Sequence, residues 1–449
     1  MSTPTIEGQE AISREGATFV PALADPALHA RDATTGGAAA AAAPPVDREL
    51  PLARWARESV PSALQGMLTV GSRPGILSLG LGLPAPELFP AADLSAAAAR
   101  VLAGDPVALQ YSPPFAPLKR HVVELMARRG VQCSEEQVFL TAGGQQGMSL
   151  LTRLLLDPGG TVLLERLCYT GLRQAVEPLR PRILSVPTDL DTGIDVDAVE
   201  AYLAAGERPA FIYAVTDGNN PLAVSISTEK RARLVELART YGVPVLEDDA
   251  YGFFQYVDDP APPMRALDDR WVLYMGTFSK IFAPALRAGW LVVPPELVPR
   301  LGIIKEATDI NTSVFTHRVI SSYIDQGLLP AHLERLRGEY RARRDAMLQA
   351  LAEHFPAQAR WRAPTAGMFV WVELPEGVDA GRLLTTAVET EQVAFLPGNA
   401  FGHGGDTFAS NCVRLNFSHS PPERLREGVA RLGRVIARAL DGPPQGKAS

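Results

Sequence analysis

The chain has 449 residues, of which 46% are hydrophobic, so it can form about two to three domains at roughly 100–200 residues each. No stretch approaches the ~18 uninterrupted apolar residues of a membrane span, and the start, MSTPTIEGQE, lacks the features of a signal peptide, so we expect a cytoplasmic protein without a membrane partner. The formal net charge of −7 argues against nucleic acid as a partner, and the three widely separated cysteines predict neither a disulfide framework nor a metal site.

The two ends of the chain contain few residues that could form a core. Residues 1–47 end in the tract ATTGGAAAAAAPPVD, whose composition predicts a disordered N-terminal extension. The last residues, DGPPQGKAS (441–449), predict a flexible tail for the same reason. We therefore expect the folded part of the protein to lie between residues 48 and 440.

Residues 100–310 alternate short β-rich runs with longer helical stretches. The predicted strands are QVFLTA (137–142), TVLLE (161–165), RILSVP (182–187), AFIYAVT (210–216), PVLED (244–248), WVLYMGT (271–277) and AGWLVV (288–293). Apolar strands separated by helices are typical of βαβ units, so this segment predicts the large domain of an α/β protein, with a mostly parallel seven-stranded sheet. In such a sheet a ligand binds at the carboxyl ends of the strands.

Residues 311–440 have a different pattern. Long amphipathic helices, such as residues 332–355, are followed by short strands near residues 367–374 and 413–418. Together with residues 48–99, this segment predicts a smaller α+β domain that is split in the sequence. The last helix is predicted to begin with Ser420 as N-cap, Pro421 in the first position and Glu423 three residues after the cap.

Glycines and polar side chains follow several of the predicted strands. Gly143, Gly144 and Gln145 lie between a strand and an apolar helix, where backbone N–H groups and the helix N-terminus can bind an anion. The turn lacks the GK[ST] of a nucleotide P-loop, so it does not predict ATP. Tyr169 and Asn220 follow two other strands, and each of these features alone is equally compatible with an ordinary loop.

Asp248 ends the strand PVLED, and Tyr251 follows three residues later. An aspartate at this place is often the N-cap of a helix. A buried carboxylate can also hold a nearby heterocyclic nitrogen in its protonated form.

Lys280 follows a buried strand and stands beside Phe278, Ile281 and Phe282 in the sequence GTFSKIFAPALRAGW (276–290). A lysine in apolar surroundings is costly, so its presence needs a chemical reason. Its desolvated amine can form a Schiff base with an aldehyde cofactor. Thr277, Ser279, Arg287 and the glycine turn could bind one phosphate, and together these features predict a pocket for pyridoxal phosphate.

Collinear motifs over about residues 60–440 resemble the fold-type I pyridoxal phosphate aminotransferases of classes I and II. The similarity is to the branch that holds 2-aminoadipate and kynurenine aminotransferases and the catalytic domains of MocR-type regulators. The motifs are LSLGLGLPAPELFP, ALQYSPP, TAGGQQG, ERLCYTG, NNP, LEDDAYG, GTFSKIFAPALRAGW, HLERLRGEYRARRDAM, PTAGMFVWVELP, FLPGNAFG and VRLNFS. The resemblance implies an enzyme that exchanges the amino group between an α-amino acid and a 2-oxo acid, with pyridoxal 5'-phosphate as cofactor.

The resemblance also implies roles for individual residues. The expected catalytic residues are Lys280, as the Schiff-base lysine, Asp248, as partner of the pyridine nitrogen, and Tyr169, which would stack on the ring. Further cofactor contacts would come from Gly143, Gly144, Gln145, Asn220, Tyr251, Thr277, Ser279, Arg287 and Tyr111. Arg414, Gly82 and Asn220 would bind the substrate. Tyr111 would reach the phosphate of a neighbouring subunit, which implies a homodimer with shared sites.

Some positions depart from the family pattern. The loop that usually reads QNPTG is NNPLA here, so that Asn219, Leu222 and Ala223 are altered while Asn220 and Pro221 remain. We expect these changes to lie near the substrate and to affect its selection rather than the cofactor.

Two alternatives to transamination remain open from the sequence. The first keeps the cofactor but changes the reaction to decarboxylation, β- or γ-elimination, replacement or oxidation of an amino acid. The second is a ligand-sensing regulator, which we disfavour because the roughly 60 residues before the matching region are too few and too rich in alanine and proline for a winged-helix module.

Overall fold

The computed structural model of the chain describes residues 50–441 except 60–69, 72 and 403–407. The predicted extension (1–47) and the tail beyond residue 441 lie outside these residues. From Ala53 onward the described residues form one compact unit. Among them, no helix is both long and apolar enough to cross a membrane. The predicted domain boundaries at residues 48, 100, 310 and 440 stay a prediction.

A seven-stranded sheet forms the centre of the described part of the chain. Its order is β2 (Val138–Thr141), β10 (Gly289–Val292), β9 (Val272–Thr277), β8 (Val245–Asp248), β7 (Ile212–Val215), β3 (Thr161–Glu165) and β4 (Arg182–Val186). β10 pairs antiparallel with β2 and β9, whereas β9, β8, β7, β3 and β4 pair in parallel. The predicted α/β class is confirmed, and the predicted strands lie within two residues of those in the structure.

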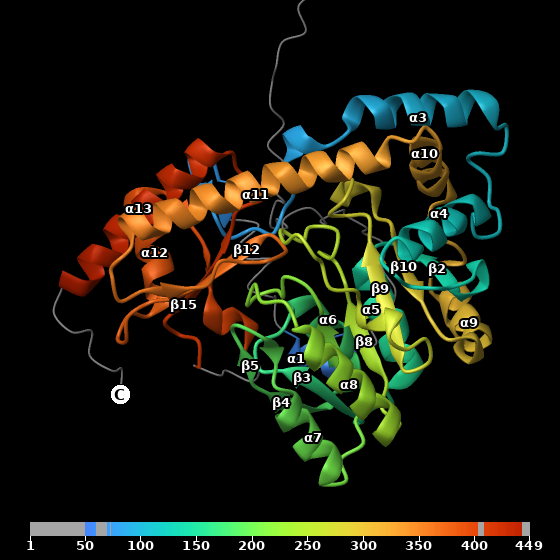
Figure 1. Ribbon diagram of the computed structural model, residues 1–449, viewed down its shortest axis with the longest axis horizontal. Coiled ribbons are helices and arrows are strands. Elements are labelled where there is room, and N and C mark those ends of the chain that lie inside the picture. The colour runs from blue at the N-terminus through green and yellow to red at the C-terminus, as the bar shows by residue number, and fades with distance from the viewer. Residues whose placement is uncertain (1–49, 60–69, 72, 403–407, 442–449) are drawn as a thin grey trace, which may run out of the picture. The chain divides into compact units, whose positions relative to one another are not determined.

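Helices cover both faces of this sheet (Figure 1). They are α5 (Gly144–Leu155), α6 (Thr170–Val176) and α9 (Val298–Asp309) on one face, and α7 (Val196–Ala204) and α8 (Thr228–Tyr241) on the other. Successive strand residues point to opposite faces, so Tyr213 packs in the α5 and α6 layer, whereas Ile212 and Ala214 pack in the α7 and α8 layer. Burial on both faces explains why the strands are apolar without alternation.

A second, four-stranded sheet has the order β11 (Arg360–Trp361), β12 (Phe369–Glu373), β15 (Cys412–Asn416) and β14 (Leu396–Pro397), and all of its pairings are antiparallel. Two shorter pairs join β1 (Leu77–Ser78) to β13 (Val393–Ala394) and β5 (Thr188–Asp189) to β6 (Gly193–Ile194). The parallel pairing of β1 with β13 brings a segment before residue 100 against the C-terminal part of the chain.

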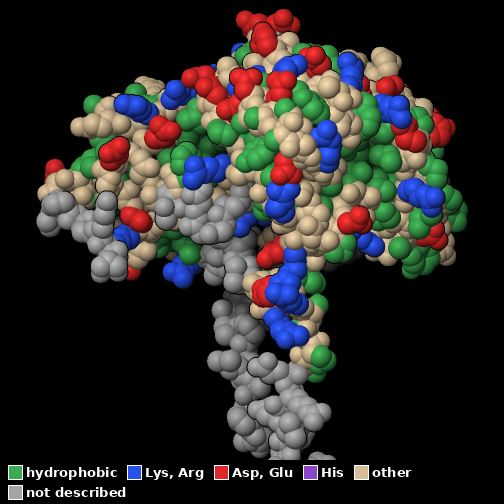
Figure 2. Space-filling view, turned by 90° about the horizontal axis from the view of Figure 1, so that it is seen from below, with side chains coloured by type: hydrophobic (Ala, Val, Ile, Leu, Met, Phe, Trp, Pro, Cys, Tyr) green, Lys and Arg blue, Asp and Glu red, His purple; other side chains and the backbone are tan. Residues whose placement is uncertain are grey.

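The remaining helices are α1 (Arg54–Glu58), α3 (Ala91–Gly104), α4 (Ala116–Ala127), α10 (Val314–Asp325), α11 (Leu329–His354), α12 (Ala380–Glu391) and α13 (Pro422–Asp441). The long helix α11 extends from the region of α10 to the four-stranded sheet, where α13 packs beside it (Figure 1). On the face shown in Figure 2, acidic and basic side chains are interspersed with apolar ones.

The last helix begins later than the sequence predicts. It starts at Pro422 rather than Pro421, so Ser420 is not its N-cap. Leu425 donates its backbone N–H to the carbonyl oxygen of Pro421, which makes Pro421 the capping residue. Two consecutive prolines, both without an N–H group, made this boundary ambiguous in the sequence.

Two glycines bring the loop after β7 against the loop before β12. Gly218 has a φ of 56°, and a Cβ atom built on it would lie 2.6 Å from the Cα of Gly367. Gly367 also has a positive φ, of 83°. The loop after β7 contains Asn220, so this close approach fixes the position of a predicted site residue.

We expect Gly218→Ala to lower the free energy of unfolding by about 1–3 kcal/mol more than Gly206→Ala. Gly206 also has a positive φ, of 92°, but a Cβ there would meet nothing within 4 Å, so it isolates the backbone penalty of about 1–2 kcal/mol. Urea unfolding of the two variants tests this. Equal losses of stability would show that the contact with Gly367 contributes nothing.

Candidate active site

One pocket lies at the carboxyl ends of the central parallel strands and collects most of the residues that the sequence singles out. The predicted residues that line it are Gly82, Gly144, Gln145, Tyr169, Asn220, Asp248, Tyr251, Thr277, Ser279, Lys280, Arg287 and Arg414. Gly143 adjoins the pocket through the Arg287 side chain. Tyr111 does not line it and is 82% exposed.

The N-terminus of α5 forms one end of the pocket. Gly143 caps the helix with a φ of 82°, and a Cβ on this residue would lie 2.5 Å from the Arg287 guanidinium. Arg287 donates a hydrogen bond of 3.3 Å to the Ser279 hydroxyl and one of 2.8 Å to the carbonyl of Ala142. A helix N-terminus, a hydroxyl and a guanidinium thus converge, which is the arrangement that a phosphate group requires.

Asp248 lies at the end of β8, in the middle of the pocket. Burial raises the pKa of its carboxyl group to about 6, and the neighbouring Asp249 adds to this rise, whereas a hydrogen bond from Tyr213 opposes it. The Tyr213 hydroxyl lies 2.6 Å from the Oδ2 atom of Asp248. Asp248 is therefore a carboxylate near its point of ionisation, and it faces the interior of the pocket.

Lys280 approaches the same space from the loop after β9. Its Nζ atom donates a hydrogen bond of 2.8 Å to the carbonyl oxygen of Gly82. Burial lowers the pKa of Lys280 to about 8, with further contributions from the positive charges of Arg414 and Arg287. A minor fraction of the amine is therefore neutral at pH 7, and this fraction can act as a nucleophile or base.

Arg414, on β15, forms the opposite end of the pocket and is only 2% exposed. Its guanidinium donates to the Asn220 side chain and, at 2.6 Å, to the carbonyl oxygen of Gly80. It lies 4.2 Å from the ring centre of Phe369 and 4.9 Å from that of Phe401. Its Nε atom is buried and has no hydrogen-bond partner among the described residues, so the guanidinium retains a donor for a ligand.

The sequence reasoning missed the two aromatic rings beside Arg414. Phe369 and Phe401 occur in the motifs GMFVWVEL and FLPGNAFG, but nothing in those motifs separates a ring that faces a ligand from an ordinary core residue. Both residues are buried at 3% exposure or less. Only the three-dimensional arrangement shows that they enclose the guanidinium.

The altered residues of the NNPLA loop do not themselves line this pocket, although Leu222 packs in one cluster with the pocket residues Leu81 and Phe401. Their expected effect on substrate selection stays a prediction. Leu222 and Ala223 line a separate groove with Trp371 and Arg360. The Asn219 amide donates a hydrogen bond of 2.8 Å to the buried Glu165 carboxylate. The cause is the turn of the loop, which directs Asn220 toward the pocket and its neighbours away from it.

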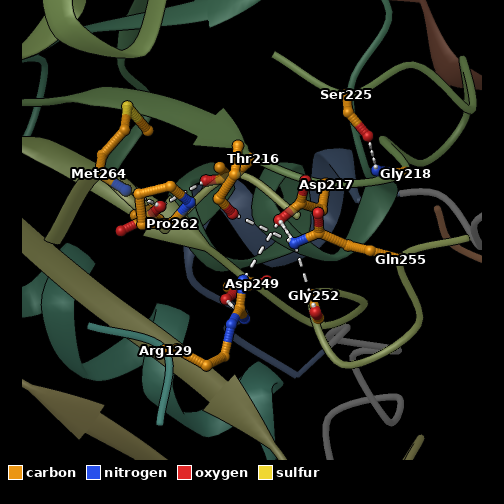
Figure 3. A network of polar contacts seen from close by, with 12 residues as sticks. Arg129, Thr216, Asp217, Gly218, Ser225, Asp249, Gly252, Gln255, Pro262 and Met264 are labelled. Atoms are coloured by element: carbon orange, nitrogen blue, oxygen red, sulfur yellow. Dashed lines mark hydrogen bonds and ion pairs between the residues drawn. The ribbon is translucent and has the colours of Figure 1, made fainter. Parts of the chain in front are cut away.

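Figure 3 shows a network of polar contacts that includes the buried charges of Arg129, Asp217 and Asp249. Asp249 pairs with Arg129 and accepts a hydrogen bond of 2.8 Å from the Tyr274 hydroxyl. Asp217 pairs with Arg231 at 2.6 Å and with Arg129 at 3.4 Å. Because Asp249 follows Asp248 directly, the network fixes the backbone on which Asp248 stands.

The pocket residues meet the chemical requirements of pyridoxal phosphate. The α5 N-terminus with Ser279 and Arg287 suits its phosphate, Asp248 suits a protonated ring nitrogen, and Lys280 suits its aldehyde. The unpartnered Nε atom of Arg414 suits the carboxylate of an amino acid.

A family model described as "Aminotransferase class I and II" matches residues 78–432 of the chain. The chain is 35% identical over 403 residues to the aromatic-amino-acid aminotransferase 1 of Thermococcus litoralis, with 88% of this chain and 96% of that protein covered. It is 38% identical over 383 residues to the 2-aminoadipate transaminase of Thermus thermophilus, with 84% of this chain and 94% of the relative covered.

Among solved structures, the chain is similar to an alpha-aminoadipate aminotransferase of Thermus thermophilus, complexed with N-(5'-phosphopyridoxyl)-L-leucine. The TM-score is 0.80 at 36% sequence identity, and the match covers 87% of this chain and 98% of the other. The similarity therefore extends over nearly the whole of a protein whose structure contains a phosphopyridoxyl amino acid.

The charge network leads to a prediction about stability. Arg129→Ala should lower the free energy of unfolding by about 3–5 kcal/mol, because Asp249 would be left as a buried charge without its cation. The control is Arg182→Ala, which removes an exposed ion pair with Glu207 and should leave the urea midpoint nearly unchanged. If the two variants unfold at the same urea concentration, the network does not stabilise the fold.

Proposed function

The chain belongs to the class I and II aminotransferases and is a pyridoxal phosphate-dependent enzyme that exchanges an amino group between an amino acid and a 2-oxo acid, and we propose that the pocket around Lys280 is its active site. The relatives named above are aminotransferases, which favours transamination over the other reactions that the sequence left open. The observation that carries the proposal is one space shared by a lysine of lowered pKa, a carboxylate and a buried arginine.

Pyridoxal phosphate, when bound, supplies an aldehyde that bonds to amines and a protonated ring that accepts electrons. In our proposal Lys280 is the residue to which it attaches. Ser279, Arg287 and the N-terminus of α5 bind its phosphate. Asp248 holds a proton on the ring nitrogen, because a carboxylate stabilises a nearby cation.

The substrate is oriented by Arg414, which binds the α-carboxylate in bidentate fashion. Asn220 accepts a hydrogen bond from the same guanidinium and so fixes its direction. When its amine is free of the cofactor, the Nζ atom of Lys280 would take the proton from the substrate Cα, since its lowered pKa leaves part of the amine neutral. Tyr169, at the N-terminus of α6, covers one side of the pocket.

We also propose that the active form is a homodimer. Tyr111 is 82% exposed and lies outside the pocket of its own chain, which suits a residue that acts in a neighbouring subunit. Leu102, Val107 and Leu109, in the same region of the chain, are each more than half exposed. Dimer formation would cover these apolar side chains. A cytoplasmic location stays a prediction.

The first test concerns the attachment of the cofactor. In the parent protein, borohydride reduction should fix pyridoxal phosphate covalently on Lys280. Peptide mass spectrometry should then locate the adduct on this lysine. In Lys280→Ala the adduct should be lost, and kcat should fall by about 10²–10⁴-fold or more. The control is Lys230→Ala, since Lys230 bonds the carbonyl of Gly193 outside the pocket and its loss should leave the adduct in place. An adduct at another lysine would refute the assignment.

A second test concerns the side chain of the substrate. In the described part of the chain, the cations that line the pocket are Lys280, Arg287 and Arg414, and our assignment leaves none of them for a second carboxylate. The remaining surface includes Leu81, Leu83, Phe369 and Phe401. We therefore propose that the enzyme prefers uncharged side chains.

Norleucine and 2-aminoadipate test this preference, because both have six carbons and only the second carries a terminal carboxylate. The test uses single-turnover reactions without a 2-oxo acid, with both amino acids at the same subsaturating concentration. The rate at which norleucine converts the cofactor to its amino form should be at least about 10-fold higher than the rate with 2-aminoadipate. Glutamine and glutamate provide a second matched pair. A faster reaction with the diacids would contradict the proposal.

A further inference from the structure

Tyr213 stands out because its hydroxyl group contacts the pocket residue Asp248 from within the sheet. It lies on β7, is 1% exposed, and does not itself line the pocket. Its hydroxyl donates a hydrogen bond to the Oδ2 atom of Asp248 at 2.6 Å. Among the described residues, no other side chain donates a hydrogen bond to this carboxylate.

Several titratable groups surround Asp248, and most of them do not favour its charge. They are Tyr213 from β7, Asp249 from the same strand end, Tyr251 from the loop beyond it, Lys280 after β9 and Tyr169 at the start of α6. Burial and Asp249 raise the pKa of Asp248, while Tyr213, the backbone N–H of Ala250 and Lys280 lower it. Of these groups, Tyr213 is the one whose side chain donates a hydrogen bond to the carboxylate.

We propose that Tyr213 is a positioning residue that holds the Asp248 carboxylate in one orientation and in its ionised form toward the ring of the cofactor. This inference rests on the proposed function, in which Asp248 meets the ring nitrogen. One carboxylate oxygen is fixed by a rigid side chain in the sheet, so the group as a whole cannot rotate freely. The ring nitrogen then meets a charge that is already oriented.

The direction of the expected pH effect follows from the hydrogen bond. A donor to the ionised carboxylate favours that form, so the loss of the Tyr213 hydroxyl raises the pKa of Asp248 above its value of about 6. Asp248 is then protonated over a wider acid range. Cofactor affinity, which requires the carboxylate, should begin to fall at a higher pH than in the parent protein.

Tyr274 provides a matched control, because it lies on the strand on the other side of β8 from Tyr213. It lies on β9, is 0% exposed, and donates a hydrogen bond of 2.8 Å to Asp249 rather than Asp248. Tyr274→Phe and Tyr213→Phe each remove one buried hydroxyl that donates to an aspartate at the end of β8. They differ in which aspartate loses its donor, so a general loss of stability would affect both in the same way.

The experiment measures the dissociation constant of pyridoxal phosphate from the apoenzyme by absorbance titration, as a function of pH, together with the melting temperature. Tyr213→Phe should weaken binding about 10-fold near neutral pH and move the acid limb of the affinity profile up by about one pH unit. In Tyr274→Phe the dissociation constant should stay within about twofold of the parent value, and the acid limb of the affinity profile should not move. Asp248→Asn should weaken binding at all pH values and abolish the limb.

The double variant Tyr213→Phe with Asp248→Asn should bind the cofactor as Asp248→Asn does, because Tyr213 acts only through that carboxylate. The inference would be overturned if Tyr213→Phe bound the cofactor with the affinity and the acid limb of the parent protein while Asp248→Asn bound it clearly more weakly. The proposed function would then still stand. Unchanged binding in Asp248→Asn would instead refute the proposed role of Asp248. An equal shift in Tyr274→Phe would also overturn the inference, since the effect would not be specific to Asp248.

Discussion

The burial of opposite charges at the carboxyl ends of β8 and β9 is the constraint on which the pocket depends. Desolvation favours the neutral form of every ionisable group, so it moves an acid and a base in opposite directions. It raises the pKa of Asp248 to about 6 and lowers that of Lys280 to about 8. Between these two values the carboxylate is mostly ionised while part of the amine is neutral, which is the pair of states that the proposed chemistry requires.

The other charged residues in and beside the pocket are held by contacts that do not involve Asp248 or Lys280. Asp249 could compete with Asp248 for any cation in the pocket, but Arg129 and Tyr274 bind it in the interior of the protein. Arg414 is held at the far end between two aromatic rings, where burial lowers the pKa of its guanidinium to about 10 and leaves it charged at neutral pH. The end that we propose for the phosphate combines the dipole of α5 with the charge of Arg287. Each charge therefore has its own local partner.

The sequence predicts much of this arrangement because a parallel sheet brings strand ends together. Lys280, Asp248 and Asn220 each follow an apolar run, and the topology alone places them at one edge. Tyr213 was not predicted, because a tyrosine inside a β-rich run looks like an ordinary core residue. Arg129 was not predicted either, since it is 88 residues from Asp217 and 120 from Asp249, and no local pattern links them. Strand-end position is visible in sequence, whereas contacts between the interiors of different elements are not.

The NNPLA loop shows how a departure in sequence can leave a site intact. Ala223 occupies the position where glycine is usual in the family pattern, and it adopts a φ of 60°, which is unfavourable for a residue with a Cβ. The loop is held in this shape by Asn219, whose backbone carbonyl accepts a hydrogen bond of 2.6 Å from Ala223 and whose amide bonds Glu165. The asparagine that replaces the usual glutamine thus binds the interior and supports the strained turn. Asn220 consequently keeps its contact with Arg414, while Leu222 and Ala223 line a neighbouring groove.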